Sequence, residues 1–130
     1  MRLIKQEDFA ILLMSELAKN YGRKSLSLSH VAEAHGVSVL FLKKIARFLR
    51  LSGLVISKEG VTGGYVLARE PRSITVWDIL LAVSGKPATA QLSQNPCPLY
   101  TRCLPQKIHQ YIENSLEKSL REISLQLLAS

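Results

Sequence analysis

The feature that most constrains the fold of this chain is a pair of short helical segments separated by one tight turn. Ser27 is a typical residue to begin the first segment, and Gly36 is a typical residue to end it. Ser38 begins the second segment in the same way, and Gly53 lies where a glycine closes a helix in a left-handed conformation. Two short helices joined by a turn that contains Gly36 match the helix-turn-helix pattern.

The residues around this motif predict a small hairpin and two flanking helices. Apolar residues recur at helical spacing over residues 6–20, which indicates an amphipathic helix ahead of the motif. Residues 54–58 and 64–67 have the composition of two short strands, and the glycines between them permit a tight reversal. Thr75 can cap a further helix that Gly85 ends. The predicted fold class is therefore mostly α with a small β-hairpin wing, a winged helix-turn-helix.

The second half of the chain predicts a long loop followed by a long helix. Residues 86–105 contain four prolines and many small polar residues, which argues against a continuous helix or strand. Residues 106–130 carry an apolar stripe at helical spacing, formed by Ile108, Ile112, Leu116, Leu120, Ile123 and Leu127. We expect this stripe to pack against a second copy of the chain in a homodimer; the alternative is that it packs on its own domain. The expected organisation is a winged helix-turn-helix domain over 1–85, a cysteine-bearing loop over 86–105 and a dimerisation helix over 106–130.

The net charge limits the partners that the chain can bind. The formal charge is +7 at pH 7, which favours a polyanionic partner, nucleic acid first and a membrane surface second. Hydrophobic residues make up 47% of the chain, as in a folded globular protein, but no apolar run is long enough to span a membrane. The charged N-terminus does not resemble a signal peptide, so we expect a cytoplasmic protein without a membrane partner.

The positive charge is concentrated in the second helix of the motif and the first strand. Residues 38–58 contain five basic residues and no acidic one. Because successive helical positions advance by about 100°, Lys43, Arg47 and Arg50 share one side of the helix, with Lys44 adjacent. A helix with one basic face and a capped start fits the recognition helix that enters the major groove of double-stranded DNA.

The expected DNA contacts divide into base-reading and phosphate-binding residues. The base-reading candidates lie in the first turns of the helix and are Ser38, Leu40, Lys43 and Lys44. Arg47, Arg50 and Lys58 come later, where phosphate contacts are favoured, and Thr62 in the hairpin turn is a further expected contact. The alternatives are a solvated basic face without a ligand and a winged-helix protein-interaction module. A protein-binding wing would not need a uniformly basic helix.

No catalytic constellation accompanies these features. The sequence has no Cys-x-x-Cys pair, no glycine-rich phosphate loop, no recognisable nucleophile motif and no paired carboxylates placed for acid–base chemistry. We therefore expect that the chain is not an enzyme.

Several short motifs in this order resemble those of the IscR/NsrR-type family of bacterial winged-helix transcription regulators. They are Asp8-Phe9-Ala10, Val31-Ala32, Gly36-Val37-Ser38, Gly53-Leu54-Val55, Gly63-Gly64-Tyr65 and Ile74-Thr75, followed by the cysteine-bearing loop. The resemblance implies a homodimer crossed through a long C-terminal helix and, as in many members, an iron-sulfur cluster whose state alters DNA affinity. The wing departs from the family, which often has an arginine before its glycine-rich turn where this chain has Glu59.

The cysteine-bearing loop implies a modified ligand set for such a cluster. Cluster-binding relatives place three cysteines here with five residues between neighbours, whereas this chain reads Cys97, Cys103 and then His109 at that spacing. Imidazole can ligate cluster iron, and the resemblance makes Asp8, or its neighbour Glu7, the fourth ligand, from the same chain or the other subunit.

Three other interpretations of this pair of cysteines remain. They are a reversible disulfide sensor, a zinc site shared with His109, and an inert remnant. The expected function is a dimeric DNA-binding regulator that senses iron, redox state or nitric oxide through an iron-sulfur cluster.

Overall fold

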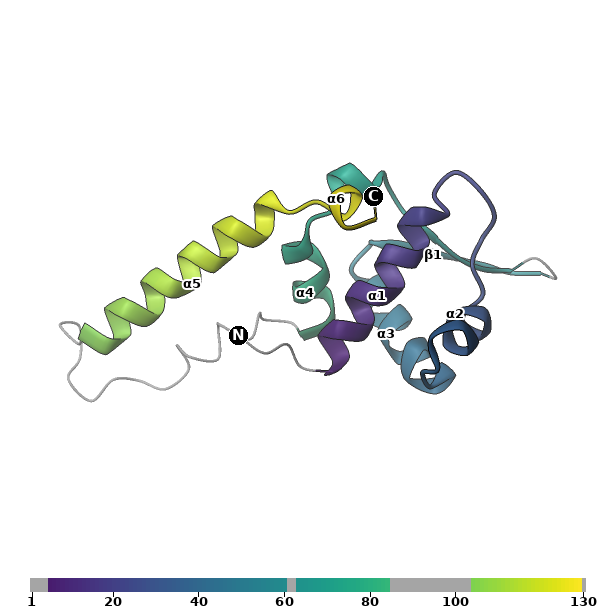
Figure 1. Cartoon of the computed structure of the whole chain (residues 1–130), viewed down its shortest axis with the longest axis horizontal. Coiled ribbons are helices and arrows are strands. Elements are labelled where there is room, and N and C mark those ends of the chain that lie inside the picture. Colours follow the sequence, from purple (N-terminus) through teal and green to yellow (C-terminus); the bar gives the residue numbers. More distant parts are fainter. Residues whose placement is uncertain (1–4, 61–62, 85–103, 130) are drawn as a thin grey trace.

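The computed structural model describes residues 5–60, 63–84 and 104–129 (Figure 1). In chain order the elements are α1 (Lys5–Lys19), α2 (Leu28–His35), α3 (Val39–Leu51), β1 (Val55–Lys58), β2 (Gly64–Leu67), the 3-10 helix η1 (Pro71–Ser73), α4 (Val76–Ser84), α5 (Leu104–Glu122) and α6 (Leu125–Ala129). The predicted fold class is confirmed, because helices surround a single two-stranded antiparallel hairpin in the described residues.

The helix-turn-helix consists of α2 and α3, joined at Gly36. Gly36 has a φ of 64°, and its N–H donates to the carbonyl oxygen of Ala32, which ends α2. Ser38 caps α3, since its side chain accepts a hydrogen bond of 3.3 Å from the backbone N–H of Phe41. Ser27 precedes α2 as expected, but its side chain makes no capping hydrogen bond. The tight turn and the capped start of α3 thus follow the sequence prediction.

The hairpin pairs β1 with β2 in a register that places Val55 opposite Leu67 and Lys58 opposite Gly64. The segment before α2 adds to the outer edge of β2, because Leu26 and Tyr65 exchange two backbone hydrogen bonds of 2.9 Å. Gly64 permits this approach, since a Cβ atom there would lie 2.5 Å from the carbonyl oxygen of Leu26. The α1–α2 connection is therefore fixed to the hairpin.

One hydrophobic core lies between α1, α3, α4, the hairpin and α6. Helical spacing makes Leu42, Ile45, Phe48 and Leu49 the inward positions of α3; Leu42, Ile45 and Leu49 are fully buried, and Phe48 is partly buried against the core. The Phe9 ring on α1 and the Phe41 ring on α3 meet in a T-shaped arrangement with centroids 5.0 Å apart, which adds a contact between these two helices. The recognition-type helix is thus held rigidly along its apolar side.

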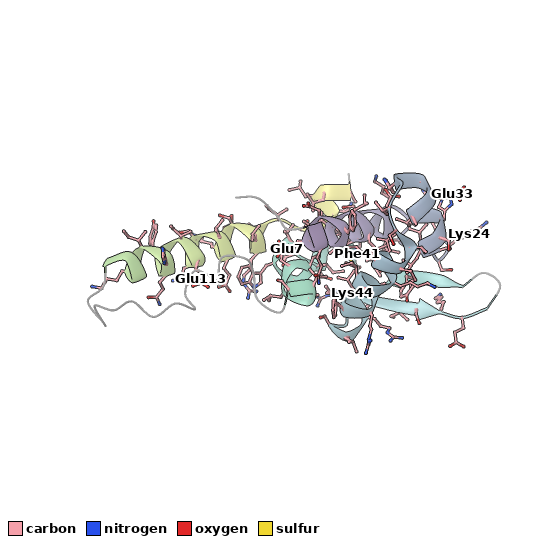
Figure 2. The ribbon with its side chains drawn as sticks, turned by 90° about the horizontal axis from the view of Figure 1, so that it is seen from below. Glu7, Lys24, Glu33, Phe41, Lys44 and Glu113 are labelled. Carbon is pink, nitrogen blue, oxygen red and sulfur yellow. The ribbon has the colours of Figure 1, made fainter. Side chains whose placement is uncertain are left out.

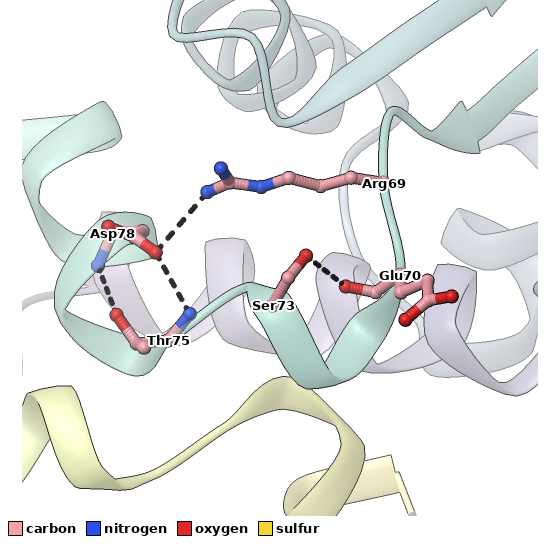
Figure 3. A network of polar contacts seen from close by, with 5 residues as sticks. All are labelled: Arg69, Glu70, Ser73, Thr75 and Asp78. Atoms are coloured by element: carbon pink, nitrogen blue, oxygen red, sulfur yellow. Dashed lines mark hydrogen bonds and ion pairs between the residues drawn. The ribbon is translucent and has the colours of Figure 1, made fainter.

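A capping network fixes the start of α4 (Figure 3). The backbone N–H of Asp78 donates to the Thr75 hydroxyl at 3.2 Å, and the N–H of Thr75 donates back to the Asp78 carboxylate at 3.0 Å. Arg69 contacts the same carboxylate at 3.4 Å, and the Ser73 hydroxyl donates to the Glu70 carbonyl oxygen at 2.8 Å. Thr75 is therefore the cap that the sequence predicts.

The C-terminal helix is shorter than the apolar spacing from Ile108 to Leu127 predicts. The helix α5 ends at Glu122, and the chain then pairs with the start of α4. The N–H of Val76 donates to the carbonyl oxygen of Ile123 at 2.9 Å. The N–H of Leu125 donates to the carbonyl oxygen of Ile74 at 2.8 Å. These two bonds interrupt the helix and direct α6 onto the core, where Leu125 is fully buried.

Among the described residues, α5 is held near its C-terminal end. Its last turn places the guanidinium of Arg121 5.5 Å from the centre of the Trp77 ring on α4, within cation–π distance. Its first half extends away from the rest of the molecule (Figure 1). The described residues of one chain therefore leave much of α5 without cover.

Candidate DNA interface

The two sides of α3 have opposite chemical character. Lys43, Lys44, Arg47 and Arg50 are all exposed, while Ile45, Ala46 and Leu49 between them are buried in the core. None of these four cations forms an ion pair with another described residue. A rigid helix with free cations along one side can bind a polyanion without first breaking internal contacts. Figure 2 shows Lys44 on this helix.

The first turn of α3 exposes one apolar side chain among these polar groups. Leu40 is 73% exposed, whereas the neighbouring Phe41 packs inward. The Ser38 hydroxyl is engaged in capping the helix, and this residue is exposed as well. The predicted base-reading residues therefore lie together at the capped start of α3.

A further predicted contact lies on the hairpin. Lys58 is exposed at the end of β1, and Glu59 is exposed directly after it. Thr62, the other predicted contact in the hairpin, lies outside the described residues.

The structure adds two basic residues that the sequence analysis missed. Arg23 and Lys24, in the connection between α1 and α2, line a cleft of about 500 Å³ together with Lys58 and Glu59. The sequence signal was an adjacent Arg-Lys pair, but its relation to Lys58 depends on the pairing of Leu26 with the hairpin. That pairing is not a local property of either segment.

The predicted metal ligands are not assembled within the described part of one chain. Cys97 and Cys103 lie outside the described residues. Asp8 is exposed near the start of α1, beside the buried Glu7, and His109 is half-buried in the first half of α5. Figure 1 shows that part of α5 well separated from α1, and no group of three potential ligands forms in the described residues. Within one chain, Asp8 and His109 therefore do not meet.

The fold and the basic helix together define a winged helix-turn-helix protein of the DNA-binding class. A family described as Rrf2, iron-dependent transcriptional regulator, matches residues 3–130. The chain belongs to the Rrf2 family of transcriptional regulators, and it is a DNA-binding regulator and not an enzyme.

Relatives and solved structures agree with this membership. The chain is 33% identical to the HTH-type transcriptional regulator CymR of Bacillus subtilis over 98 residues, which are 75% of this chain and 71% of that protein. The structure of CymR, the global cysteine regulator of B. subtilis, matches with a TM-score of 0.81 at 30% identity, covering 99% of this chain and 96% of that one. The structure of IscR from T. potens matches with a TM-score of 0.82 at 30% identity, covering 98% of this chain and 85% of that one. The resemblance to IscR-type regulators is confirmed.

No helix among the described residues is long and apolar enough to cross a membrane.

Proposed function

We propose that this chain is a homodimeric transcription regulator that reads a double-stranded operator with the start of α3. The observation that carries the proposal is the division of α3 into a fully buried apolar side and an exposed side with four cations that form no ion pair among the described residues. The same division argues against a protein-interaction module, because protein interfaces are depleted of lysine at their centres. Such a regulator works where the bacterial chromosome lies, so the cytoplasm is its proposed compartment.

The side chains of the first turns suit particular base edges. Lys43 and Lys44 can donate to the O6 and N7 atoms of guanine, and the exposed Leu40 can contact the methyl group of thymine. Ser38 lies at the same end of the helix, within the base-reading set. Arg47, Arg50 and Lys58, with Thr62 of the hairpin turn, are proposed to contact backbone phosphates, which supply affinity without reading the sequence.

The proposed homodimer forms through α5. Ile108, Tyr111 and Ile112 are 49%, 73% and 39% exposed, so the apolar face of this helix is open to solvent in a single chain. A second copy of α5 would cover it, and a two-fold dimer would present two α3 helices to a palindromic operator. Ile108 and Ile112 belong to the stripe expected from the sequence, and the structure adds Tyr111 to this face.

We propose that Cys97, Cys103 and His109 hold an iron-sulfur cluster with Asp8 of the partner subunit. The donor set fits: two thiolates and an imidazole are ligands that cluster iron accepts, and the carboxylate of Asp8 is exposed rather than committed to the core. The separation of Asp8 from α5 within one chain favours a carboxylate supplied across the dimer. When bound, the cluster would supply a redox- and iron-sensitive centre.

A thiol-based sensor is the second candidate function. It is favoured by the likeness to CymR, a relative whose structure is described as that of a global cysteine regulator. In that case Cys97 and Cys103 would form a reversible disulfide, or bind zinc with His109. In either case the signal changes DNA affinity only if it favours one arrangement of the two α3 helices over another.

The DNA-reading proposal is tested on a duplex selected from a random library with the wild-type protein. The Lys43→Ala, Lys44→Ala double variant is expected to lose more than about tenfold in affinity because it removes two contacts to base edges. Fluorescence anisotropy measures the affinity, and circular dichroism checks the fold. The control is Arg72→Gln, Lys118→Gln, which removes the same charge from exposed positions on η1 and α5. Equal losses in both variants would refute base reading by α3.

Anaerobic purification tests the sensing proposal. The wild-type protein is expected to be brown and to contain iron and acid-labile sulfide, and the Cys97→Ser variant is expected to be colourless. Colourless wild-type protein would refute the cluster. Stoichiometric zinc, or a disulfide that forms and breaks under mild redox conditions, would then establish which of the two thiol alternatives holds.

A further inference from the structure

We propose that Arg23, Lys24 and Lys58 form a phosphate-binding cleft that holds the DNA backbone beside the base pairs read by α3. The inference rests on the proposed DNA-reading role of α3 and extends it to the connection between α1 and α2. The ligand is a phosphodiester of the operator flank, bound without regard to base sequence.

The backbone places these three cations together. Gly22, with a φ of 78°, turns the chain at the end of α1, and Leu26 then pairs with Tyr65 on the hairpin through two hydrogen bonds of 2.9 Å. Gly64 allows that contact because any Cβ atom there would collide with the Leu26 carbonyl oxygen. Arg23 and Lys24 lie between these two fixed points. They are therefore held next to β2, and Lys58, opposite Gly64 on β1, lines the same cleft.

The cleft itself has the chemistry of an anion site. The described residues that line it are Arg23, Lys24, Ser25, Ser27, Lys58, Glu59 and Gly63, and its volume is about 500 Å³. Arg23, Lys24 and Lys58 also line an adjoining cleft of about 300 Å³ that runs along the outer edge of the hairpin. The three cations thus border a continuous stretch of surface between the α1–α2 connection and the hairpin.

The charges of the cleft are available to a ligand. In residues 5–60, 63–84 and 104–129, none of Arg23, Lys24 and Lys58 forms an ion pair, although the carboxylate of Glu59 lies in the same lining. Three cations against one carboxylate leave an excess positive charge. An anion bound here would therefore gain favourable electrostatic energy from these cations without breaking an internal salt bridge.

Exposure of the lining favours a polymer backbone over a small metabolite. Arg23, Lys24 and Lys58 are all exposed, whereas a pocket for a small molecule buries most of its ligand among enclosing side chains. DNA carries a charge about every 1.7 Å, so in the proposed complex a duplex seated on α3 would extend past the hairpin and present phosphates to this surface. Figure 2 shows Lys24 towards the end of the molecule to which the hairpin extends, apart from Lys44 on α3.

The experiment compares two lengths of the same selected duplex. One carries an additional helical turn of arbitrary sequence on each side, and the other is trimmed to the selected base pairs. The Arg23→Gln, Lys24→Gln variant is expected to bind the long duplex roughly tenfold more weakly than the wild type. The slope of log affinity against log salt should fall by about 1 for each lost phosphate contact. On the trimmed duplex the variant and the wild type should bind alike, and the selected sequence should be the same for both proteins.

The controls separate this inference from the DNA-reading proposal on which it rests. Arg72→Gln, Lys118→Gln removes two positive charges elsewhere and should leave the length dependence unchanged. An equal loss on both duplexes, or an equal loss in this control, would overturn the cleft. A third result would also overturn it. Inorganic phosphate would raise the melting temperature of the wild type but not of Arg23→Gln, Lys24→Gln, and DNA length would have no effect on the affinity of either protein. The site would then bind a free anion. Each of these outcomes concerns the cleft alone. If the Lys43→Ala, Lys44→Ala variant loses DNA affinity in the same experiments, the DNA-reading role of α3 still holds.

Discussion

Leu40 is the residue whose exposure has the clearest consequence for recognition. A leucine that is 73% exposed gains nothing from the core of its own chain, and its neighbours on the exposed side of α3 are cations. In the major groove, thymine alone presents a methyl group among the four bases. An exposed leucine at the capped start of α3 therefore favours an operator with a thymine near the guanines that the two lysines can read.

Substitution of Leu40 and removal of one methyl group from the DNA test this contact together. Replacing the contacted thymine by deoxyuridine should weaken wild-type binding by about fourfold per half-site, since burial of a methylene-sized group contributes about 0.8 kcal/mol. Leu40→Ala should show a similar loss on the thymine duplex and no further loss on the deoxyuridine duplex. Anisotropy titrations of the four combinations measure the coupling. Additive losses would show that Leu40 does not contact that methyl group.

At the scale of single elements, the features predicted from sequence are those set by neighbouring residues. Gly36, Ser38 and Thr75 act within one turn of their own helix, so their roles could be predicted and are confirmed. The basic side of α3 was predictable for the same reason, because a helix repeats every 3.6 residues. The inward positions of α3 followed from the same repeat.

Features that depend on contacts between distant segments were not predictable in this way. The placement of Arg23 beside Lys58 requires the bridge between Leu26 and Tyr65, and the break before α6 requires hydrogen bonds from the start of α4. The apolar residues keep their helical spacing on both sides of the break before α6, so the sequence pattern alone indicates one uninterrupted helix. The positions of Cys97 and Cys103 lie outside the described residues, and their role stays a prediction.

The docking of α6 leads to a direct comparison of two leucines two positions apart. Leu125 is fully buried, whereas Leu127 is 63% exposed. Leu125→Ala should lower the free energy of unfolding by about 2–5 kcal/mol because it leaves a cavity in the core. Leu127→Ala should change it by less than about 0.5 kcal/mol. Urea unfolding followed by circular dichroism measures both, and equal values would contradict the packing of α6 described above.

At the scale of the whole molecule, the proposed dimer depends on the projecting half of α5. The helix is fixed near Trp77 at its C-terminal end, and its apolar face is open towards its other end. A monomer with this face in water would present a contiguous apolar surface, of the kind that marks a protein–protein interface. Dimerisation through α5 would also set the distance between the two α3 helices.

A charge placed in that face should separate the two chains. Ile112→Glu is expected to be monomeric in sedimentation velocity, because a dimer would bury an unpaired carboxylate. Its affinity for a two-site operator should fall by about 100-fold, since the second half-site is then no longer bound intramolecularly. Gln110→Glu adds the same charge at an exposed position on the other side of α5 and should stay dimeric. A dimeric Ile112→Glu protein would place the interface elsewhere.

The return of the chain from α5 to the core has a consequence for how such a protein can evolve. Leu125 closes the same core that positions α3, so the expected division at residue 85 separates two stretches of sequence but not two independent folding units. A recombination event that joined residues 1–85 to an unrelated partner would leave an opening where α6 packs. Residues 1–85 and the segment that carries α6 are therefore constrained to be inherited together rather than exchanged separately.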